Sequence, residues 1–187
     1  MAANLKLERG NTSLLIIDIQ ERLAAAMQAP GLERIVKNTG VLMEGAKALG
    51  MPVLITEQYP KGLGPTMPVL RDALPAESLP VSKTAFSCLG ADEVAQKLRD
   101  SGRKQVLITG METHVCVFQT VRDLVAGGYQ PFVVRDAVLS RTQENYDVGL
   151  SLMKEAGATI TSTEAALFDL LGAAGTPEFK KLSPLIK

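Results

Sequence analysis

The chain has 187 residues, 46% of them apolar, and its 20 basic residues balance its 20 acidic residues. This length and composition favour a single globular domain over residues 1–187 and exclude a disordered chain. The balanced charge argues against a nucleic-acid partner, the absence of a long apolar run against a membrane partner, and two cysteines are too few for a disulfide framework. Because the N-terminal segment has no apolar core typical of a signal peptide, we expect a cytoplasmic protein.

The first predicted strand is the apolar run Ser13–Asp18, which ends in an acid. Such a run is typical of a strand that is buried on both faces in a parallel sheet. Asp18 would then lie at the carboxyl end of the strand, where open α/β sheets place their functional sites. Considered alone, an aspartate at this position is more often a helix N-cap or a turn residue.

A helix is predicted between Gly31 and Gly50, where a glycine is a suitable C-terminal stop. Its apolar stripe has helical spacing and predicts the face that packs on the sheet. The stripe consists of Ile35, Thr39, Leu42, Ala46 and Leu49.

The second predicted strand, Pro52–Thr56, is followed by the Gly- and Pro-rich segment Glu57–Pro68. We expect this segment to be a long loop at the same sheet edge as Asp18, and long loops in compact domains are often functional. Gln58 and Tyr59 are its expected pocket-facing residues.

The middle of the chain contains a short predicted helix, Val69–Ala73, and a third short strand around Pro80 and Val81, with Lys83 at its end. Most lysines are solvated surface charges, so Lys83 considered alone carries no function. Phe86 and Cys88 follow, and Cys88 is expected to serve packing. A helix marked by Ala91, Val94, Ala95 and Leu98 then ends at Gly102.

The stretch Val106–Val125 organises the rest of the chain. A short strand, Val106–Thr109, stops at Gly110, and a helix resumes with Val117, Val121 and Val125 on one face. Cys116 falls in the first helical turn, where unpaired N–H groups and the helix dipole favour a thiolate, the reactive form of cysteine. The alternative is that Cys116 is a small buried apolar residue.

The last third of the chain continues the alternation of strands and helices. It predicts a strand at Phe132–Arg135, a helix whose stripe consists of Val148, Leu152 and Ala156, a strand at Ala158–Ile160 and a helix at Thr163–Leu171. The amphipathic tail, residues 176–187, would dock on the body or on a second subunit. This order predicts a three-layer α/β/α fold around a doubly wound, mainly parallel six-stranded sheet of the Rossmann-like type.

Three reactive side chains, Asp18, Lys83 and Cys116, follow three of these strands and can meet at one sheet edge. Their segments, LLIIDIQ, SKTAFS and GMETHVCV, resemble in this order those of the isochorismatase-like cysteine hydrolases. The resemblance extends from Ser13 to about Leu171. The segments TEQYPKGLGPT, GMETHVC and VVRDAVLSRT are most similar to the branch called isochorismatase domain-containing proteins.

The resemblance implies a catalytic triad of Asp18, Lys83 and Cys116 that hydrolyses a small amide, carbamoyl or related carbonyl compound through a thioester. It also implies a cis peptide between Met111 and Glu112, and an oxyanion hole formed by the backbone N–H groups of Glu112 and Cys116. The residues expected to line the substrate pocket are Gln20, Gln58, Tyr59, Phe86 and His114.

The chain departs from the family at one known motif. Members that deamidate nicotinamide carry an Asp-x-His metal motif after the second strand, whereas this chain reads TEQYPKGLG there and has His114 as its only histidine. We therefore expect no metal and no cofactor. The presence of Cys116 also argues against isochorismate, because the enzymes that cleave this vinyl ether lack the cysteine.

Family members commonly form dimers or larger assemblies, so a homo-oligomer, a dimer or tetramer, is expected. A nucleotide-binding domain is disfavoured because TGMETHV lacks the spaced glycines that admit a pyrophosphate. A non-hydrolytic redox-sensing or interaction protein, with Cys116 oxidised reversibly, remains the alternative.

Overall fold

The computed structural model of the protein describes residues 5–186. Its six strands form one sheet in the order β3-β2-β1-β4-β5-β6, and every neighbouring pair is parallel. The predicted doubly wound α/β fold is thus confirmed. The strands are β1 (Thr12–Ile17), β2 (Val53–Gln58), β3 (Val81–Lys83), β4 (Gln105–Met111), β5 (Gln130–Leu139) and β6 (Thr159–Thr161).

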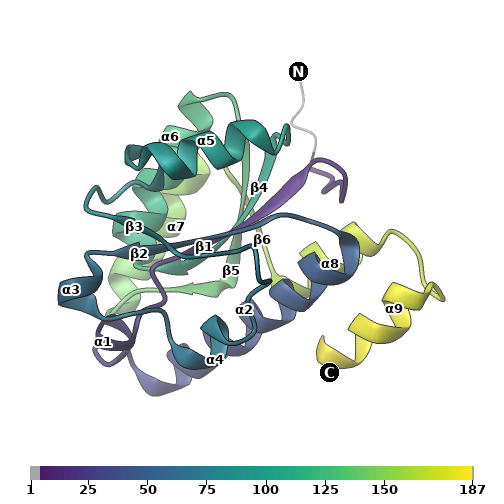
Figure 1. Ribbon diagram of the computed structural model, residues 1–187, viewed down its shortest axis with the longest axis horizontal. Coiled ribbons are helices and arrows are strands. Elements are labelled where there is room, and N and C mark those ends of the chain that lie inside the picture. The colour runs from purple at the N-terminus through teal and green to yellow at the C-terminus, as the bar shows by residue number, and fades with distance from the viewer. Residues whose placement is uncertain (1–4, 187) are drawn as a thin grey trace.

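Helices cover both faces of the sheet (Figure 1). Each face has its own apolar core, because alternate residues of the central strands point to opposite sides. One face carries α2 (Ala29–Leu49), α4 (Pro68–Arg71) and α8 (Thr163–Leu171), and the other carries α5 (Asp92–Asp100), α6 (Phe118–Ala126) and α7 (Gln143–Glu155).

The shorter helical segments lie at the ends of these layers. The tail helix α9 (Pro177–Leu182) packs outside α2, where Leu182 is buried against Val41 and Leu167. Of the two expectations for the tail, docking on the body of its own chain is therefore the one that the structure shows. The remaining segments are α1 (Glu21–Ala24), α3 (Pro60–Leu63), the 3₁₀ turns η1 (Cys88–Gly90) and η3 (Ser183–Ile186), and the π-helical turn η2 (Thr113–Val117).

In two helices the buried face can be compared with the apolar stripe predicted from the sequence. In α2 four of the five stripe residues are buried, and the helix ends at Gly50 with φ 63°. In α7 the prediction was wrong, since Val148 and Leu152 are exposed. The helix instead buries Tyr146, Gly149 and Met153, because the Tyr146 hydroxyl donates to the carbonyl of Arg135 and this fixes the inward face.

The predicted loop Glu57–Pro68 is more ordered than its composition suggests. Strand β2 continues to Gln58, and the single-turn helix α3 follows it directly. The carboxylate of Glu57 then accepts hydrogen bonds from the backbone N–H and the hydroxyl of Thr66, at 2.7 and 2.8 Å. These internal hydrogen bonds replace the solvation that a free loop would need.

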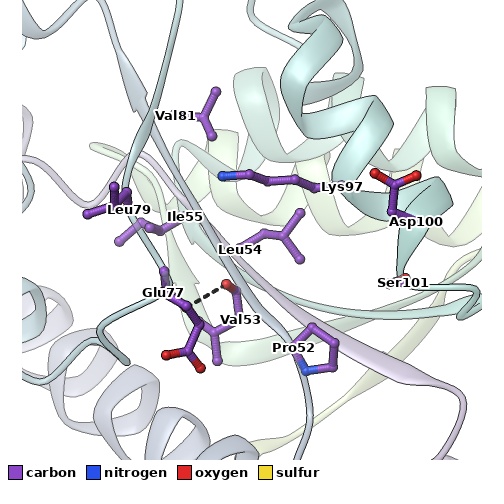
Figure 2. Close-up of a pocket in the computed structure, with 11 residues that line it drawn as sticks. Pro52, Val53, Leu54, Ile55, Glu77, Leu79, Val81, Lys97, Asp100 and Ser101 are labelled. Atoms are coloured by element: carbon purple, nitrogen blue, oxygen red, sulfur yellow. Dashed lines mark hydrogen bonds between the residues drawn. The ribbon is translucent and has the colours of Figure 1, made fainter.

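Strand β3 is short and pairs only with Thr56–Gln58, so the first half of β2 has an open edge. A surface cavity of about 340 Å³ lies there between β2, the segment around Leu79, and α5 (Figure 2). The hydroxyl of Ser78 donates to the carbonyl of Val53 at 2.9 Å and so satisfies part of this edge. The cavity lies toward the amino end of β2, away from the strand ends that carry Asp18, Lys83 and Cys116.

Among residues 5–186, no helix has both the length and the apolar character needed to span a membrane.

Candidate active site

Asp18 lies directly after β1 and is fully buried. Its backbone has φ 53°, a left-handed conformation that a residue other than glycine adopts at a cost of about 1 kcal/mol or more. The neighbouring strand makes room for this bend at Gly110, where an added Cβ would lie 2.1 Å from the carbonyl oxygen of Ile17. The close approach of β1 and β4 at this point therefore requires a glycine beside Asp18.

Lys83 and Asp18 form a buried ion pair. The distance from Lys83 Nζ to Asp18 Oδ2 is 2.7 Å, and both side chains have 0% exposure. The ammonium also donates to Gln58 Oε1 at 2.7 Å and to the carbonyls of Ala85 and Phe86 at 3.3 and 3.1 Å. The prediction that Lys83 is buried and paired with Asp18 is confirmed, and the hydrogen-bonding capacity of the ammonium is used within the protein.

Two opposing effects set the pKa of Lys83. Burial by itself lowers the pKa, but the negative charge of Asp18, with smaller contributions from Cys88 and Cys116, outweighs burial and raises the pKa above 10.5. Lys83 is therefore a permanent cation in the neutral pH range. It can stabilise negative charge but cannot act as a base there.

Cys116 lies in η2, between the end of β4 and the start of α6, and is 6% exposed. Two contacts position this turn. The hydroxyl of Thr120 donates to the carbonyl of Cys116 at 2.6 Å. On the other side Gly149 of α7 packs so closely that an added Cβ would lie 2.8 Å from the carbonyl carbon of Thr113.

The charge state of Cys116 differs from the one expected from its position near a helix N-terminus. Burial, followed by the negative charge of Asp18, raises the pKa of the Cys116 thiol, and Lys83 offsets this only in part. The expected resting thiolate is therefore wrong: the thiol is protonated, and it lies next to a carboxylate that can accept its proton.

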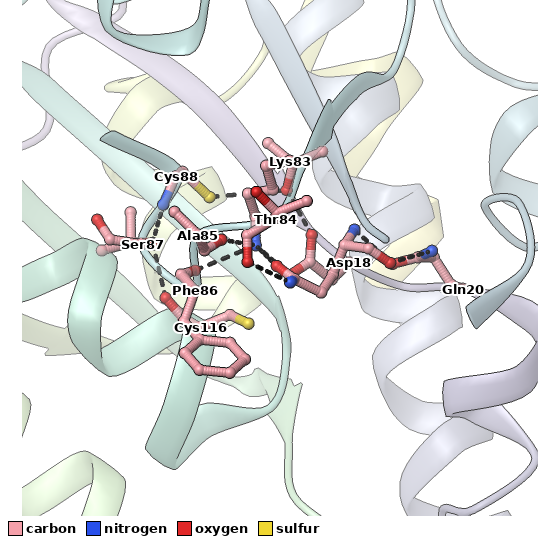
Figure 3. Close-up of polar contacts among 12 residues, drawn as sticks. Asp18, Gln20, Lys83, Thr84, Ala85, Phe86, Ser87, Cys88 and Cys116 are labelled. Carbon is pink, nitrogen blue, oxygen red and sulfur yellow. Dashed lines mark hydrogen bonds and ion pairs between the residues drawn. The ribbon is translucent and has the colours of Figure 1, made fainter. Parts of the chain in front are cut away.

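Thr56, for which the sequence predicted no role, and Cys88, which was expected to serve packing, lie next to this cluster, and Figure 3 shows Cys88. The hydroxyl of Thr56, in β2, donates to Asp18 Oδ1 at 2.7 Å. The sulfur of Cys88 lies 3.6 Å from the same hydroxyl, and the Cys88 backbone N–H donates to Thr120 Oγ1 at 2.9 Å. Burial and the charge of Asp18 raise the pKa of Cys88 to about 11.

Glu112 connects β4 to η2, and the peptide bond between Met111 and Glu112 is cis, as the resemblance implies. Its carbonyl accepts hydrogen bonds from the N–H groups of Val115 and Val117 at 3.0 and 3.2 Å. Its carboxylate accepts from the backbone N–H and from Nε of Arg141, at 3.1 and 3.0 Å. Glu112 is thus fixed at both its backbone and its side chain.

Gln20 and Gln58, which were expected in the substrate pocket, are buried, and their side-chain amides are hydrogen-bonded within the protein. The Gln20 amide exchanges two hydrogen bonds with the backbone of Gln58, at 2.8 and 3.0 Å, and donates a third to Gly64 at 2.6 Å. The Gln58 amide bonds Lys83 through its oxygen and the carbonyl of Thr84 through its nitrogen. These side chains hold Lys83 in place and have little capacity left for a ligand.

The other three expected pocket residues are more accessible. Tyr59 and Phe86 are exposed at the carboxyl edge, and Tyr59 lines a cavity of about 420 Å³ with Lys61, Ser82 and Lys83. His114 is partly buried, and its Nδ1 lies 3.0 Å from Ser140 Oγ. Their role in substrate binding remains a prediction.

Comparison with known proteins agrees with the fold and the motifs. The sequence model of the isochorismatase domain matches residues 12–165. The chain belongs to the isochorismatase family. Isochorismatase domain-containing protein 2 of Bos taurus is 37% identical over 179 residues, covering 95% of this chain and 84% of the relative.

Two solved structures are also similar to this chain. The MAR1 ribonuclease of Caenorhabditis elegans is 35% identical, with a TM-score of 0.88, over 97% of this chain and 92% of that one. The YcaC gene product of Escherichia coli, described as an octameric hydrolase of unknown specificity, is 20% identical. Its TM-score of 0.89 over 99% of this chain and 92% of that one shows the shared fold.

Proposed function

We propose that the protein is a cysteine hydrolase that cleaves a small amide, carbamoyl or related carbonyl compound through a thioester on Cys116. The observation that supports this most strongly is the buried Asp18 carboxylate, which meets the Lys83 ammonium at 2.7 Å and lies close enough to the Cys116 thiol to add to the effect of burial in raising its pKa. A nucleophile, a base and an orienting group in one cluster are the parts that nucleophilic catalysis requires.

In the first half of the reaction the Cys116 proton passes to Asp18 as the sulfur bonds to the carbonyl carbon. Transfer at the moment of attack suits a thiol whose pKa is raised, because the thiolate forms only when its substrate is present. The carbon–nitrogen bond then breaks, Asp18 returns the proton to the leaving amine, and a thioester remains. Lys83 keeps its three protons and stabilises the negative charge that Asp18 and the sulfur share.

In the second half, water attacks the thioester carbon and gives a proton to Asp18. The carbon–sulfur bond breaks, the acid leaves, and Asp18 returns this proton to the sulfur of Cys116. In both halves the carbonyl oxygen becomes negative in a tetrahedral intermediate. We assign its stabilisation to the backbone N–H groups of Glu112 and Cys116, since one such donor is worth roughly 100- to 1,000-fold in rate.

The burial of the cluster limits the size of the substrate. Asp18 and Lys83 have 0% side-chain exposure and Cys116 is 6% exposed, so only a small reacting group can reach the sulfur. Substrates with a compact carbonyl, such as a primary amide or a carbamoyl group, are therefore preferred over peptides. The expectation that neither metal nor cofactor takes part remains a prediction from the missing Asp-x-His motif.

Peroxide sensing, the alternative function for Cys116, is less well supported. Sensor cysteines react as exposed thiolates of low pKa, whereas the pKa of Cys116 is raised and its side chain is buried. A pKa held up by an adjacent carboxylate suits proton transfer to that carboxylate better than spontaneous oxidation.

A substrate screen tests the proposal. Purified protein is incubated with a panel of small primary amides, carbamoyl compounds and esters, and released ammonia or acid is measured. Cys116→Ala serves as the matched control, because it keeps the fold and removes the nucleophile. Hydrolysis by the native chain alone supports the proposal, and equal hydrolysis by both proteins would refute it.

The homo-oligomer is also a proposal. The protein of Escherichia coli with the same fold is described as octameric, and Leu185 in the tail is partly exposed on this chain. Light scattering at micromolar concentration should give a mass above 20.0 kDa, the mass of one chain. A single 20 kDa species would contradict the proposal.

A further inference from the structure

A small cavity of about 190 Å³ lies at the carboxyl edge of the sheet, between the start of α2 and the end of β5. Among residues 5–186, the lining of this cavity includes two arginines and no acidic residue. Its polar residues are Gln28, Arg34, Ser140, Arg141, Thr142, Gln143 and Tyr146. Arg34 and Arg141 are both solvent-exposed and Arg141 pairs with Glu112, so no further anion is needed to stabilise them, but they give the cavity a positive potential that attracts one.

The hydrogen bonding of the two arginines supports this view. The side chain of Arg34 makes no hydrogen bond or ion pair with any other residue in the described range 5–186. The side chain of Arg141 bonds Glu112 through Nε alone, so within the same range its two terminal amino groups have no partner. A guanidinium offers paired donors in a plane, which is the arrangement that carboxylate and phosphate oxygens match.

Helix α2 adds to the positive potential of this cavity. The helix is 21 residues long, and Gln28, its N-cap, makes no side-chain cap hydrogen bond. Gln28 and Gly31 both line the cavity, so the first turn of the helix opens on it. The free N–H groups and the positive end of the dipole favour an anion next to the two arginines.

We propose that this cavity, defined by Arg34, Arg141 and the first turn of α2, binds the carboxylate or phosphate group of a small ligand. Its volume suits one such group with a short attachment. The site lies at the end of β5, one strand beyond β4, whose end leads to Cys116. Arg141 joins the two places, because it also holds the carboxylate of Glu112.

This inference does not depend on the proposed hydrolase, and it is tested by binding. Uniformly ¹⁵N-labelled full-length protein is titrated separately with inorganic phosphate and with acetate. The Nε–H signals of Arg34 and Arg141 and the amide signal of Gly31 are followed by NMR. Saturable shifts at these three positions are expected with at least one anion, and the one that binds more tightly identifies the group as a phosphate or a carboxylate.

Two variants make the test specific. Arg34→Gln should weaken binding about tenfold, since a charged hydrogen bond to an oxyanion is worth that much. Lys37→Gln removes the same charge one turn further along α2, outside the cavity, and should leave binding within twofold. No saturable shift with either anion, or equal weakening by the two variants, would overturn the proposal. Binding that persists in Cys116→Ala separates this site from the catalytic proposal.

Discussion

The two cysteines of this chain lie near the same carboxylate, that of Asp18, but they differ in exposure and in contacts. Cys88 is fully buried in η1, and its sulfur contacts the hydroxyl of Thr56 at 3.6 Å. Cys116 is slightly exposed in η2, and its thiol lies near Asp18. Burial and the charge of Asp18 raise the pKa of both thiols.

The difference shows that neither a low pKa nor a helix N-terminus distinguishes the proposed nucleophile in this fold. Exposure does, because Cys116 is 6% exposed and Cys88 is 0% exposed, so only Cys116 can be reached by a substrate while Asp18 lies nearby to accept its proton. Thr56 lies between Cys88 and that carboxylate and donates its own proton to it. Cys88 is thus close to the site but is not placed to pass its proton to Asp18.

Removing each sulfur in turn should produce the largest contrast. Cys116→Ala is expected to reduce turnover of any substrate found in the screen by at least about 10⁴-fold, since no other group can form the thioester. Cys88→Ala should keep most of the activity and lose stability through the small cavity it creates. Steady-state kinetics and urea unfolding of both variants measure this contrast, and similar losses of turnover would contradict it.

Replacing Lys83 by Met removes the cation whose charge lowers the pKa of both thiols. Turnover should fall by roughly 100- to 1,000-fold, because the charge shared by Asp18 and the sulfur loses its counterion. Since Lys83 lowers the pKa of Cys116, its removal should raise that pKa further.

The pH profile of Cys116 alkylation by iodoacetamide should therefore move to higher pH in Lys83→Met. Lys61→Met, at the exposed side of the adjacent cavity, is the matched control and should leave the profile in place. An unchanged profile in Lys83→Met would show that the ammonium does not act on the sulfur.

The stability of the fold should fall at alkaline pH. The pKa of Cys88 is 9.0 in a free thiol and about 11 in the folded protein, so the native state holds this proton where the unfolded chain releases it. Stability is therefore complete below pH 9 and declines above it, by about 2 kcal/mol at pH 10.5 from Cys88 alone. Cys116 and Lys83, whose pKa values are also raised, act in the same direction.

Urea unfolding at pH 8 and pH 10.5 measures this effect. Cys88→Ala should show a shallower decline than the native chain, whatever its absolute stability. A decline of equal size in both proteins would mean that Cys88 does not hold its proton in the folded state.

The smallest expected effect concerns Thr56. Thr56→Val removes the hydrogen bond to Asp18 Oδ1, so the carboxylate that receives the Cys116 proton loses a donor that orients it. We expect about a tenfold loss of kcat/KM at neutral pH. Thr56→Ser keeps the hydroxyl and should restore the rate, whereas a similar loss in Thr56→Ser would indicate a packing defect.

The sheet, and the convergence of Asp18, Lys83 and Cys116 at one of its edges, could be predicted from the sequence. Buried parallel strands have a distinctive apolar pattern, and their carboxyl ends meet at one edge. The residues that support the cluster were harder to predict. Thr56 contacts Asp18 because β1 and β2 pair in one register, and Cys88 of η1 contacts Thr56 in turn. No local sequence pattern encodes these contacts between distant segments.

Two other expectations failed for related reasons. The stripe through Val148 and Leu152 has helical spacing, but the tertiary contacts of Tyr146 and Gly149 select the face that α7 buries. The thiolate expected at Cys116 followed from the helix terminus alone. Burial and the nearby Asp18 carboxylate outweigh it, and both depend on the folded structure.

The central claim is that Cys116 carries the acyl group of the substrate. The most direct test is intact-mass measurement after rapid acid quenching of the protein with an ester of a slowly hydrolysed acid, followed by peptide mapping. The mass should rise by one acyl group per chain, the group should map to Cys116, and the adduct should disappear with time as the acid is released. An adduct on Cys88, or turnover with no acyl-enzyme at any time, would contradict the mechanism.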